Sequence, residues 1–147
     1  SIENVKIIGG DRIECRVDEG NGKASYQNLN DFGDGFRQYL SLIIDLYAFR
    51  DGYLFIDEID KGIHYTVLEK MWEIVLTLSK ENNVQVFATT HSLECIQAYS
   101  RAAEKLNDRD ITLTTLVKNK DNQIKAIVRD YDVFTSSIQD GNEVRGW

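Results

Sequence analysis

The amino-acid sequence predicts an α/β fold whose core is a mainly parallel sheet flanked by helices. Three observations lead to this expectation. Between residues 36 and 106 the hydrophobic pattern runs helix, strand, helix, strand, helix, the order that builds right-handed crossovers around a parallel sheet. The two central strands are short apolar runs without alternation, which is typical of strands buried on both faces. Strand-like patterns precede and follow this core, so we expect a β-hairpin at the N-terminus and a strand pair near the C-terminus.

Length and composition fit one ordinary globular domain over residues 1–147. Apolar residues make up 42% and charged residues 28% of the chain, and a chain of this length can bury a sizeable core. With 17 Lys and Arg against 24 Asp and Glu, the net charge is −7, which disfavours nucleic acid as the main contact. No apolar run reaches the roughly 20 residues of a membrane span, and no signal segment opens the chain. Cys15 and Cys95 match no metal-ligand spacing, so we expect reduced thiols in a cytoplasmic protein without a membrane partner.

The first region, residues 1–30, is expected to form a hairpin or small meander. Apolar residues dominate 2–8, and Gly9-Gly10-Asp11 then signals a turn. Residues 12–17 alternate apolar and charged side chains, a second turn follows at 19–22, and 24–27 is a possible short strand.

The second region, residues 31–106, is the predicted α/β core. A polar loop over 28–35 leads into it. The expected elements are a helix over 36–49, a strand over 53–56, a helix over 65–80, a strand over 84–88 and a helix over 93–106. Gly52 is expected to cap the first helix at its C-terminal end, and Ser92 is expected to cap the third at its N-terminal end. Met71 and Trp72 fall on the apolar stripe of the second helix and are expected in the core.

The third region, residues 107–147, is expected to add strands and a short helix. Residues 111–117 and 124–128 have strand patterns on either side of a turn at 119–122, and 131–139 has a helical pattern.

Polar residues close both central strands. Asp57 and Glu58 follow the first strand, and Thr89, Thr90 and His91 follow the second. In open α/β sheets the ligand site lies beyond the carboxyl ends of the strands, and an acidic pair there is costly unless it is paired or used. One use is a Mg²⁺ site that bridges a carboxylate to nucleotide phosphates. A second carboxylate could then position or deprotonate water, and a nearby histidine could donate a hydrogen bond to a phosphoryl oxygen.

Four segments, in this order and spacing, extend the pattern. Residues 32–37 resemble an ABC signature motif, 54–58 resemble Walker B, 59–64 resemble the following segment with its D-loop, and 88–92 resemble a switch-histidine loop. Over residues 28–98 the chain therefore resembles the C-terminal half of an ABC-type ATPase nucleotide-binding domain, which has a P-loop NTPase fold. It most resembles the stand-alone OLD-like and SMC-like ATPases.

The resemblance implies roles for three residues in the hydrolysis of ATP. Asp57 would help to hold Mg²⁺, Glu58 would orient or activate the attacking water, and His91 would contact the γ-phosphate. The cofactors implied are ATP and Mg²⁺.

The resemblance also implies a head-to-tail homodimer that forms on ATP binding. The signature segment of one subunit would cap the ATP bound to the other, and Asp60 would lie near this interface. The residues that would bind the cofactor are Gly33, Asp34, Gly35 and Arg37 of the segment, together with Asp60. Glycines let backbone N–H groups approach a phosphate, and a helix N-terminus attracts anions.

The sequence departs from the family pattern in two ways. Gly33 stands where the signature motif has a serine, which removes one hydroxyl, and Phe36 replaces a polar or small residue. No Walker A motif is present, because the single Gly-Lys pair at 22–23 has Val17 five residues before its glycine and Ala24 after its lysine. We therefore expect this chain to be a C-terminal lobe whose partner is an N-terminal lobe with Walker A, and to be inactive alone.

The leading hypothesis is an ATPase coupled to an effector protein or DNA, in DNA repair or phage defence. One alternative is a non-catalytic dimerisation or interaction module derived from the same fold. Another is a metal-dependent nuclease of the topoisomerase–primase type with Asp57, Glu58 and Asp60 as ligands, although their spacing argues against it. Two residues stay open at this point: Arg37 could contact phosphate or cover the helix surface, and His64 could cap the following helix or serve the site.

Overall fold

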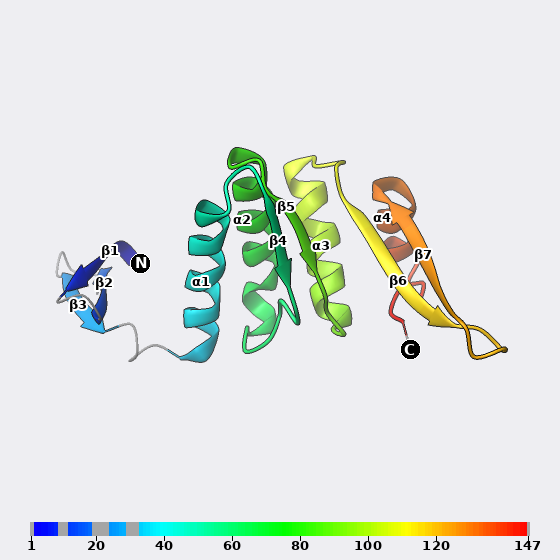
Figure 1. The fold of residues 1–147 in the computed structure, drawn as a ribbon, viewed down its shortest axis with the longest axis horizontal. Coiled ribbons are helices and arrows are strands. Elements are labelled where there is room, and N and C mark those ends of the chain that lie inside the picture. The colour runs from blue at the N-terminus through cyan, green and yellow to red at the C-terminus, as the bar shows by residue number, and fades with distance from the viewer. Residues whose placement is uncertain (1, 9–11, 19–23, 29–32, 147) are drawn as a thin grey trace.

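The computed structural model describes residues 2–8, 12–18, 24–28 and 33–146 of the chain. At the N-terminus, β1 (Ile2–Ile8), β2 (Arg12–Asp18) and β3 (Ala24–Asn28) form an antiparallel sheet in the order β1-β2-β3. Figure 1 shows this sheet at one end of the molecule, beyond α1. The three strands of the predicted small meander are confirmed, and the turns predicted at 9–11 and 19–22 lie outside the described residues.

The central elements surround one parallel pair of strands. They are α1 (Asp34–Ala48), β4 (Tyr53–Ile56), the 3₁₀ turn η2 (Tyr65–Val67), α2 (Leu68–Glu81), β5 (Gln85–Ala88) and α3 (Leu93–Leu106). Strands β4 and β5 pair in parallel, from Tyr53 opposite Gln85 to Ile56 opposite Ala88. Helices α2 and α3 lie behind this pair in Figure 1. The register means that the residues following both strands leave the sheet at the same edge.

The C-terminal elements are an antiparallel hairpin and a short helix. Strands β6 (Thr112–Lys118) and β7 (Ile124–Asp130) pair with each other, and α4 (Tyr131–Gln139) follows. Asp130 caps α4, because its carboxylate accepts the Val133 N–H at 3.0 Å. The predicted strand pair and helix are confirmed.

The hydrophobic core lies between the helices and the inner face of the strands. The largest apolar side chains with less than 2% exposure are Leu46, Ile59, Met71, Val75, Cys95, Phe134 and Val144. The Trp72 indole N–H donates to the carbonyl oxygen of Cys95 at 3.1 Å and thereby joins α2 to α3. The expectation that Met71 and Trp72 belong to the core is confirmed, and burial raises the pKa of the Cys95 thiol.

Helix α1 differs from its prediction at both ends. Asn28 belongs to β3, and Asp34 and Gly35 belong to the helix rather than to a loop. The helix begins early because the Gly33 carbonyl accepts the Phe36 N–H at 3.0 Å and Asp34 places a negative charge in the first turn. Gly52 is not the C-terminal cap: the helix ends at Ala48, and Phe49 is its C-cap.

The reversal after α1 takes place at Asp51, which has a φ of 58°. Its N–H donates to the carbonyl oxygen of Asn82 at 2.9 Å. The second helix also begins differently from its prediction, because residues 65–67 form a 3₁₀ turn before α2.

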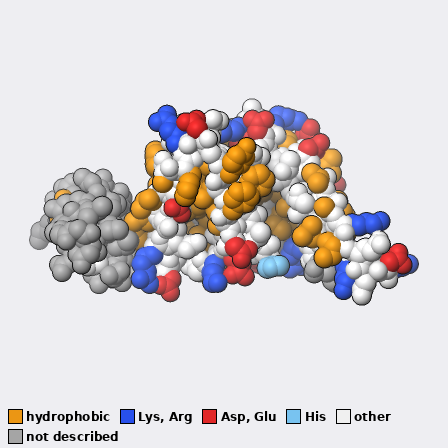
Figure 2. All heavy atoms as spheres, in the orientation of Figure 1, with side chains coloured by type: hydrophobic (Ala, Val, Ile, Leu, Met, Phe, Trp, Pro, Cys, Tyr) orange, Lys and Arg blue, Asp and Glu red, His pale blue; other side chains and the backbone are white. Residues whose placement is uncertain are grey.

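Within this chain the central strands are buried on one face only, which differs from the expectation of burial on both faces. Phe55 is 74% exposed and Phe87 is 44% exposed, and their rings stack at 4.9 Å on the face opposite α2 and α3. Figure 2 shows hydrophobic side chains gathered over this part of the surface. The helices cover only one face of the pair. None of the helices in the described part of the chain is both long and apolar enough to cross a lipid bilayer.

Candidate functional site

The parallel register brings the two predicted polar strand ends into contact. Thr89 donates its hydroxyl proton to Asp57 Oδ1 at 2.5 Å, and the Glu58 N–H donates to the same hydroxyl oxygen at 2.9 Å. The Ile59 N–H donates to the Thr89 carbonyl at 3.0 Å. Asp57 and Glu58 are therefore held against the segment that carries His91.

Glu58 adopts a backbone conformation that is uncommon for its residue type. Its φ is 50°, in the left-handed region, where a residue other than glycine carries a strain of about 1–3 kcal/mol. Ile59 anchors the turn in the core with 1% exposure, and the Lys61 N–H closes the turn on the Glu58 carbonyl at 2.9 Å. Such strain persists only where the surroundings hold it, and it is commonest at functional positions.

The Glu58 carboxylate is accessible. Its side chain is 47% exposed, and its single ion pair among the described residues is with Lys61, whose Nζ lies 3.1 Å from Oε2. An ion pair this exposed contributes little stability. The carboxylate can therefore exchange Lys61 for another partner, such as a water molecule.

Asp60 and His91 lie on the same edge in different surroundings. Thr90 donates its hydroxyl to Asp60 Oδ1 at 2.6 Å and accepts the Ser92 N–H at 3.0 Å. His91 is exposed.

His64 has a structural role. Its Nδ1 accepts the Thr66 N–H and caps η2, and its ring packs against Tyr65 with 4.4 Å between centroids. Of the two interpretations of His64, capping the following helix is the one that these contacts support.

Within the signature-like segment, Gly33 is the N-cap of α1 and residues 34–37 form its first turn, which packs on the loop after β4, while Phe32 lies outside the described residues. A Cβ atom added to Gly35 would lie 2.1 Å from the Gly62 carbonyl oxygen, so no side chain fits at that contact. Gly33 is open, with nothing within 4 Å of an added Cβ, and no side chain caps the helix there. Arg37 forms an ion pair with Asp34, which supports its interpretation as a helix-surface residue in this state.

The contacts do not join the whole predicted set. Asp57 and the Glu58 backbone both hydrogen-bond to Thr89, and Asp60 hydrogen-bonds to Thr90. Gly35 packs against the backbone of Gly62. Within the described ranges, no hydrogen bond or ion pair connects the first turn of α1 or His91 to either Asp57 or Glu58.

Sequence reasoning missed the individual roles of Thr89, Thr90 and Lys61. A usable signal for the threonines was present: Asp57 and Thr89 each follow the last residue of a paired strand, so a parallel register places them opposite each other. The contact of Lys61 with Glu58 depends on the left-handed backbone of Glu58, which no local sequence pattern predicts.

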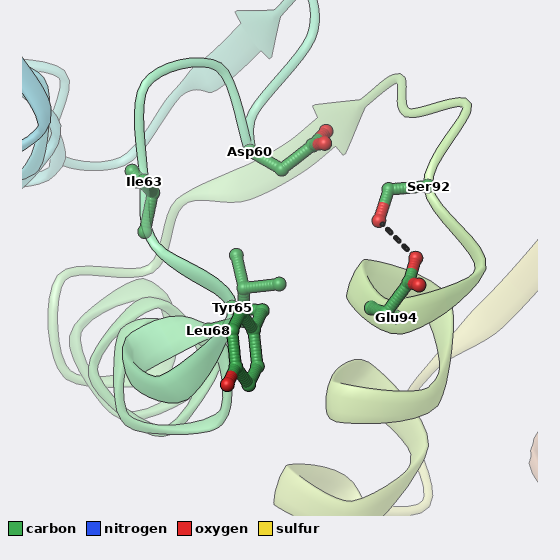
Figure 3. Close-up of a pocket in the computed structure, with 6 residues that line it drawn as sticks. All are labelled: Asp60, Ile63, Tyr65, Leu68, Ser92 and Glu94. Carbon is green, nitrogen blue, oxygen red and sulfur yellow. Dashed lines mark hydrogen bonds between the residues drawn. The ribbon is translucent and has the colours of Figure 1, made fainter.

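A pocket of about 400 Å³ lies beside this edge, between the loop after β4 and the start of α3. Figure 3 shows Asp60 and Ile63 on the loop side, Tyr65 and Leu68 on the next turn, and Ser92 and Glu94 opposite them. Ser92 donates to Glu94 Oε2 at 3.1 Å. A backbone N–H and this hydroxyl hold the pKa of Glu94 below its ordinary value. Two carboxylates make the pocket unsuited to a phosphate group.

The residues present fit a Mg²⁺ ion that arrives with a nucleotide better than a self-contained metal centre. No group of three or more His, Cys, Asp or Glu side chains in the described part of the chain is arranged to hold a metal. Asp57 offers one carboxylate, and Mg²⁺ is commonly bound by one or two carboxylates together with phosphate oxygens and water. The nuclease alternative loses support, because Asp57, Glu58 and Asp60 bond to Thr89, Lys61 and Thr90 respectively rather than converging.

Comparison with solved structures supports the predicted fold. A chain from work described as "Structural biochemistry of ATP-driven dimerization and DNA stimulated activation of SMC ATPases" superposes with a TM-score of 0.54 at 15% sequence identity. The match covers 92% of this chain and 74% of that chain. The α/β fold of a P-loop NTPase is thereby confirmed.

Two curated proteins share part of the sequence. An "ATP/GTP phosphatase" of Helicobacter pylori (strain ATCC 700392 / 26695) is 33% identical over 72 residues, 47% of this chain and 20% of that protein. An "uncharacterized protein" of Methanocaldococcus jannaschii (strain ATCC 43067 / DSM 2661 / JAL-1 / JCM 10045 / NBRC 100440) is 38% identical over 73 residues, 50% of this chain and 64% of that protein. The match therefore spans a fifth of the first relative and just under two thirds of the second.

The family comparison covers the site itself. Residues 4–96 match a family described as "AAA domain, putative AbiEii toxin, Type IV TA system", and this range includes the signature-like segment, Asp57 to Asp60 and His91. Since the match extends over more than half of the sequence, the chain belongs to this AAA domain family of P-loop ATPases.

Proposed function

We propose that this chain is the C-terminal lobe of an ATPase that binds Mg-ATP and hydrolyses it at a head-to-tail dimer interface. The observation that carries the proposal is the contact of Asp57 and the Glu58 backbone with one threonine hydroxyl at the carboxyl edge of a parallel strand pair. The family, and a relative described as an ATP/GTP phosphatase, support ATPase chemistry.

In this proposal three residues act on the nucleotide. Asp57 is the carboxylate that holds the Mg²⁺ of Mg-ATP, which would supply charge neutralisation on the phosphates when bound. Glu58 exchanges its exposed ion pair with Lys61 for a water molecule and takes that water's proton. His91, exposed beyond β5, donates a hydrogen bond to the γ-phosphate.

The N-terminus of α1 provides the cap over the ATP of the second subunit. Gly33 is extended and open, and the first N–H groups of the helix are the donors that an anion would use. The contact of Gly35 with Gly62 couples this cap to the loop that carries Asp60. The solved structure with a similar fold comes from work on the ATP-driven dimerization of SMC ATPases, which supports the proposal of a dimer.

The partner lobe with Walker A would complete the sheet. Among the described strands, β5 pairs with β4 alone and β6 with β7 alone. Residues of β5 and β6 line the same cleft of about 1130 Å³. Open strand edges readily accept another strand, so we propose that the Walker A lobe adds one there and covers Phe55 and Phe87. Slower amide exchange across 85–88 on adding that lobe would support this arrangement, and unchanged exchange would contradict it.

The decisive experiment is Glu58→Gln in the intact protein that contains this chain. We expect ATP binding to persist and kcat to fall by about 100-fold or more, because a general base contributes roughly 10²–10⁴. Glu81→Gln, at an exposed position at the end of α2, is the matched control and should turn over ATP normally. Turnover near wild type in Glu58→Gln would refute the assignment of the base.

The non-catalytic interaction module is the second candidate. The observation that favours it is the exposed aromatic surface of Tyr53, Phe55 and Phe87 on β4 and β5. An intact protein that associates with itself or a partner but hydrolyses no ATP would support the module. Hydrolysis that depends on Glu58 would favour the ATPase, whose coupling to an effector protein or to DNA we include in the proposal.

A further inference from the structure

We propose that Thr89 is a positioning residue that holds the metal-binding carboxylate and the catalytic base in one working arrangement. This inference rests on the proposed function, because it assigns Thr89 to the same site. It concerns the hydroxyl group of Thr89 rather than its contribution to the core, since the residue is exposed.

The hydrogen-bonding capacity of one hydroxyl matches what the two acidic residues require. A threonine hydroxyl has one proton to donate and lone pairs that accept. Thr89 uses the proton on Asp57 Oδ1 at 2.5 Å and a lone pair on the Glu58 N–H at 2.9 Å. A bond to a carboxylate is charge-assisted and stronger than a neutral one, so it orients Asp57 and leaves Oδ2 for a ligand.

The same hydroxyl holds the unusual backbone of Glu58. The N–H that it accepts belongs to the residue with φ 50°, and that torsion determines where the Glu58 side chain leaves the chain. Two backbone bonds frame the contact: the Thr89 N–H donates to Ile56 O at 2.9 Å, and the Ile59 N–H donates to Thr89 O at 3.0 Å. The backbone bonds fix the segment, and the hydroxyl fixes the two functional residues within it.

The neighbouring threonine has a different assignment. Thr90 donates to Asp60 and accepts the Ser92 N–H, so it links the D-loop-like segment to the start of α3. Thr89 is the threonine that contacts both Asp57 and Glu58, and it lies two residues before His91. A displacement of the loop that carries His91 is thereby transmitted directly to the metal-binding carboxylate and to the base.

The test compares three variants of the intact ATPase. Thr89→Val removes the hydroxyl at nearly constant volume, and Thr89→Ser keeps it. Thr77→Val is the control because, among the described residues, the Thr77 hydroxyl donates to the Glu73 carbonyl of its own helix and not to the site. We measure kcat, the KM for ATP and the Mg²⁺ concentration that gives half-maximal rate. Thr89→Val should lower kcat by about tenfold or more and raise the required Mg²⁺ several-fold, with the KM for ATP changed by less than about threefold.

The control variants separate positioning from folding. Thr89→Ser should restore kcat to within about threefold of wild type, and Thr77→Val should leave every parameter unchanged. If Thr89→Val does not fold, Thr89→Ala replaces it in the comparison with Thr89→Ser. Equal activity of the variants with and without the hydroxyl overturns the inference.

The Glu58→Gln variant distinguishes a failure of the positioning role of Thr89 from a failure of the proposed function. If Glu58→Gln is inactive and Thr89→Val is as active as wild type, the positioning role fails while the proposed function stands. If Glu58→Gln is as active as wild type, the proposed function fails, and the positioning role fails with it.

Discussion

Replacing Gly35 with alanine tests the contact that joins the start of α1 to the loop after β4. A Cβ atom at residue 35 would lie 2.1 Å from the Gly62 carbonyl oxygen and 3.1 Å from its carbonyl carbon. Both atoms belong to the backbone, so no side-chain rotation can make room. Gly62 itself has a φ of 72°, in the left-handed region that glycine adopts without a steric penalty.

The expected effect combines two opposing terms. Overpacking of this kind costs typically about 1–3 kcal/mol, and alanine recovers up to about 1 kcal/mol over glycine inside a helix. Subtracting a gain of up to about 1 kcal/mol from a cost of about 1–3 kcal/mol leaves a central expectation of about 1–2 kcal/mol lost from the free energy of unfolding. For a chain of this size, each kcal/mol lowers Tm by about 2–4 °C, so we expect a decrease of roughly 2–8 °C.

Thermal unfolding followed by far-UV circular dichroism measures this effect. The matched control is Gly33→Ser, since an added Cβ meets nothing within 4 Å and the backbone at φ −63° and ψ 162° is open to serine. Serine is favoured at this helix-capping position by a few tenths of a kcal/mol over glycine, so its Tm should stay level or rise by about 1 °C. A Gly35→Ala variant that melts at or above the wild-type temperature would refute the close approach of the two segments.

Two further predictions concern acid stability and backbone strain. Hydrogen bonds from Lys105 and Lys70 lower the pKa of Glu73 below its ordinary value of 4.5. Its contribution to stability is therefore present above pH 4.5 and is lost as the pH falls through the lowered pKa. In urea titrations, Glu73→Gln should reduce the loss of unfolding free energy between pH 7 and pH 4, and an unchanged loss would contradict the assignment. The Glu58→Gly variant should be more stable than Glu58→Ala by about 1 kcal/mol, because only alanine carries the penalty of a left-handed backbone. Equal Tm values for the two variants would show that residue 58 is not held at a φ of 50°.

Much of the fold could be predicted because its signals are local. The apolar stripe that predicts a helix over 93–106 and the serine that caps it both lie within a few residues of each other, and α3 has these bounds. The turn at 119–122 likewise follows from local polar residues, and Asn119 accepts the Gln123 N–H there at 2.8 Å. The errors at Gly52, Asn28, Asp34 and Gly35 are boundary errors, where one or two backbone hydrogen bonds decide the outcome.

The same difference between local and long-range contacts applies to the candidate site. The residue types at the strand ends predicted where chemistry would be found, and the parallel pair brings Asp57 and Thr89 together as that reasoning required. The roles of Glu58, His91 and the first turn of α1 remain predictions that the proposed experiments test. Thr89 as a shared partner and Lys61 as the present partner of Glu58 came from the structure.

By itself, then, the sequence determined the order of helices and strands, the family pattern and the residues that end the two parallel strands, because periodicity, capping and turn chemistry act between near neighbours. Only the tertiary structure decided that Thr89 bonds across 32 residues to Asp57, that no side chain fits at residue 35 beside Gly62, and that Phe55 is exposed within this chain. These outcomes depend on strand register and on which faces are covered, and both are set by packing between segments far apart in the chain.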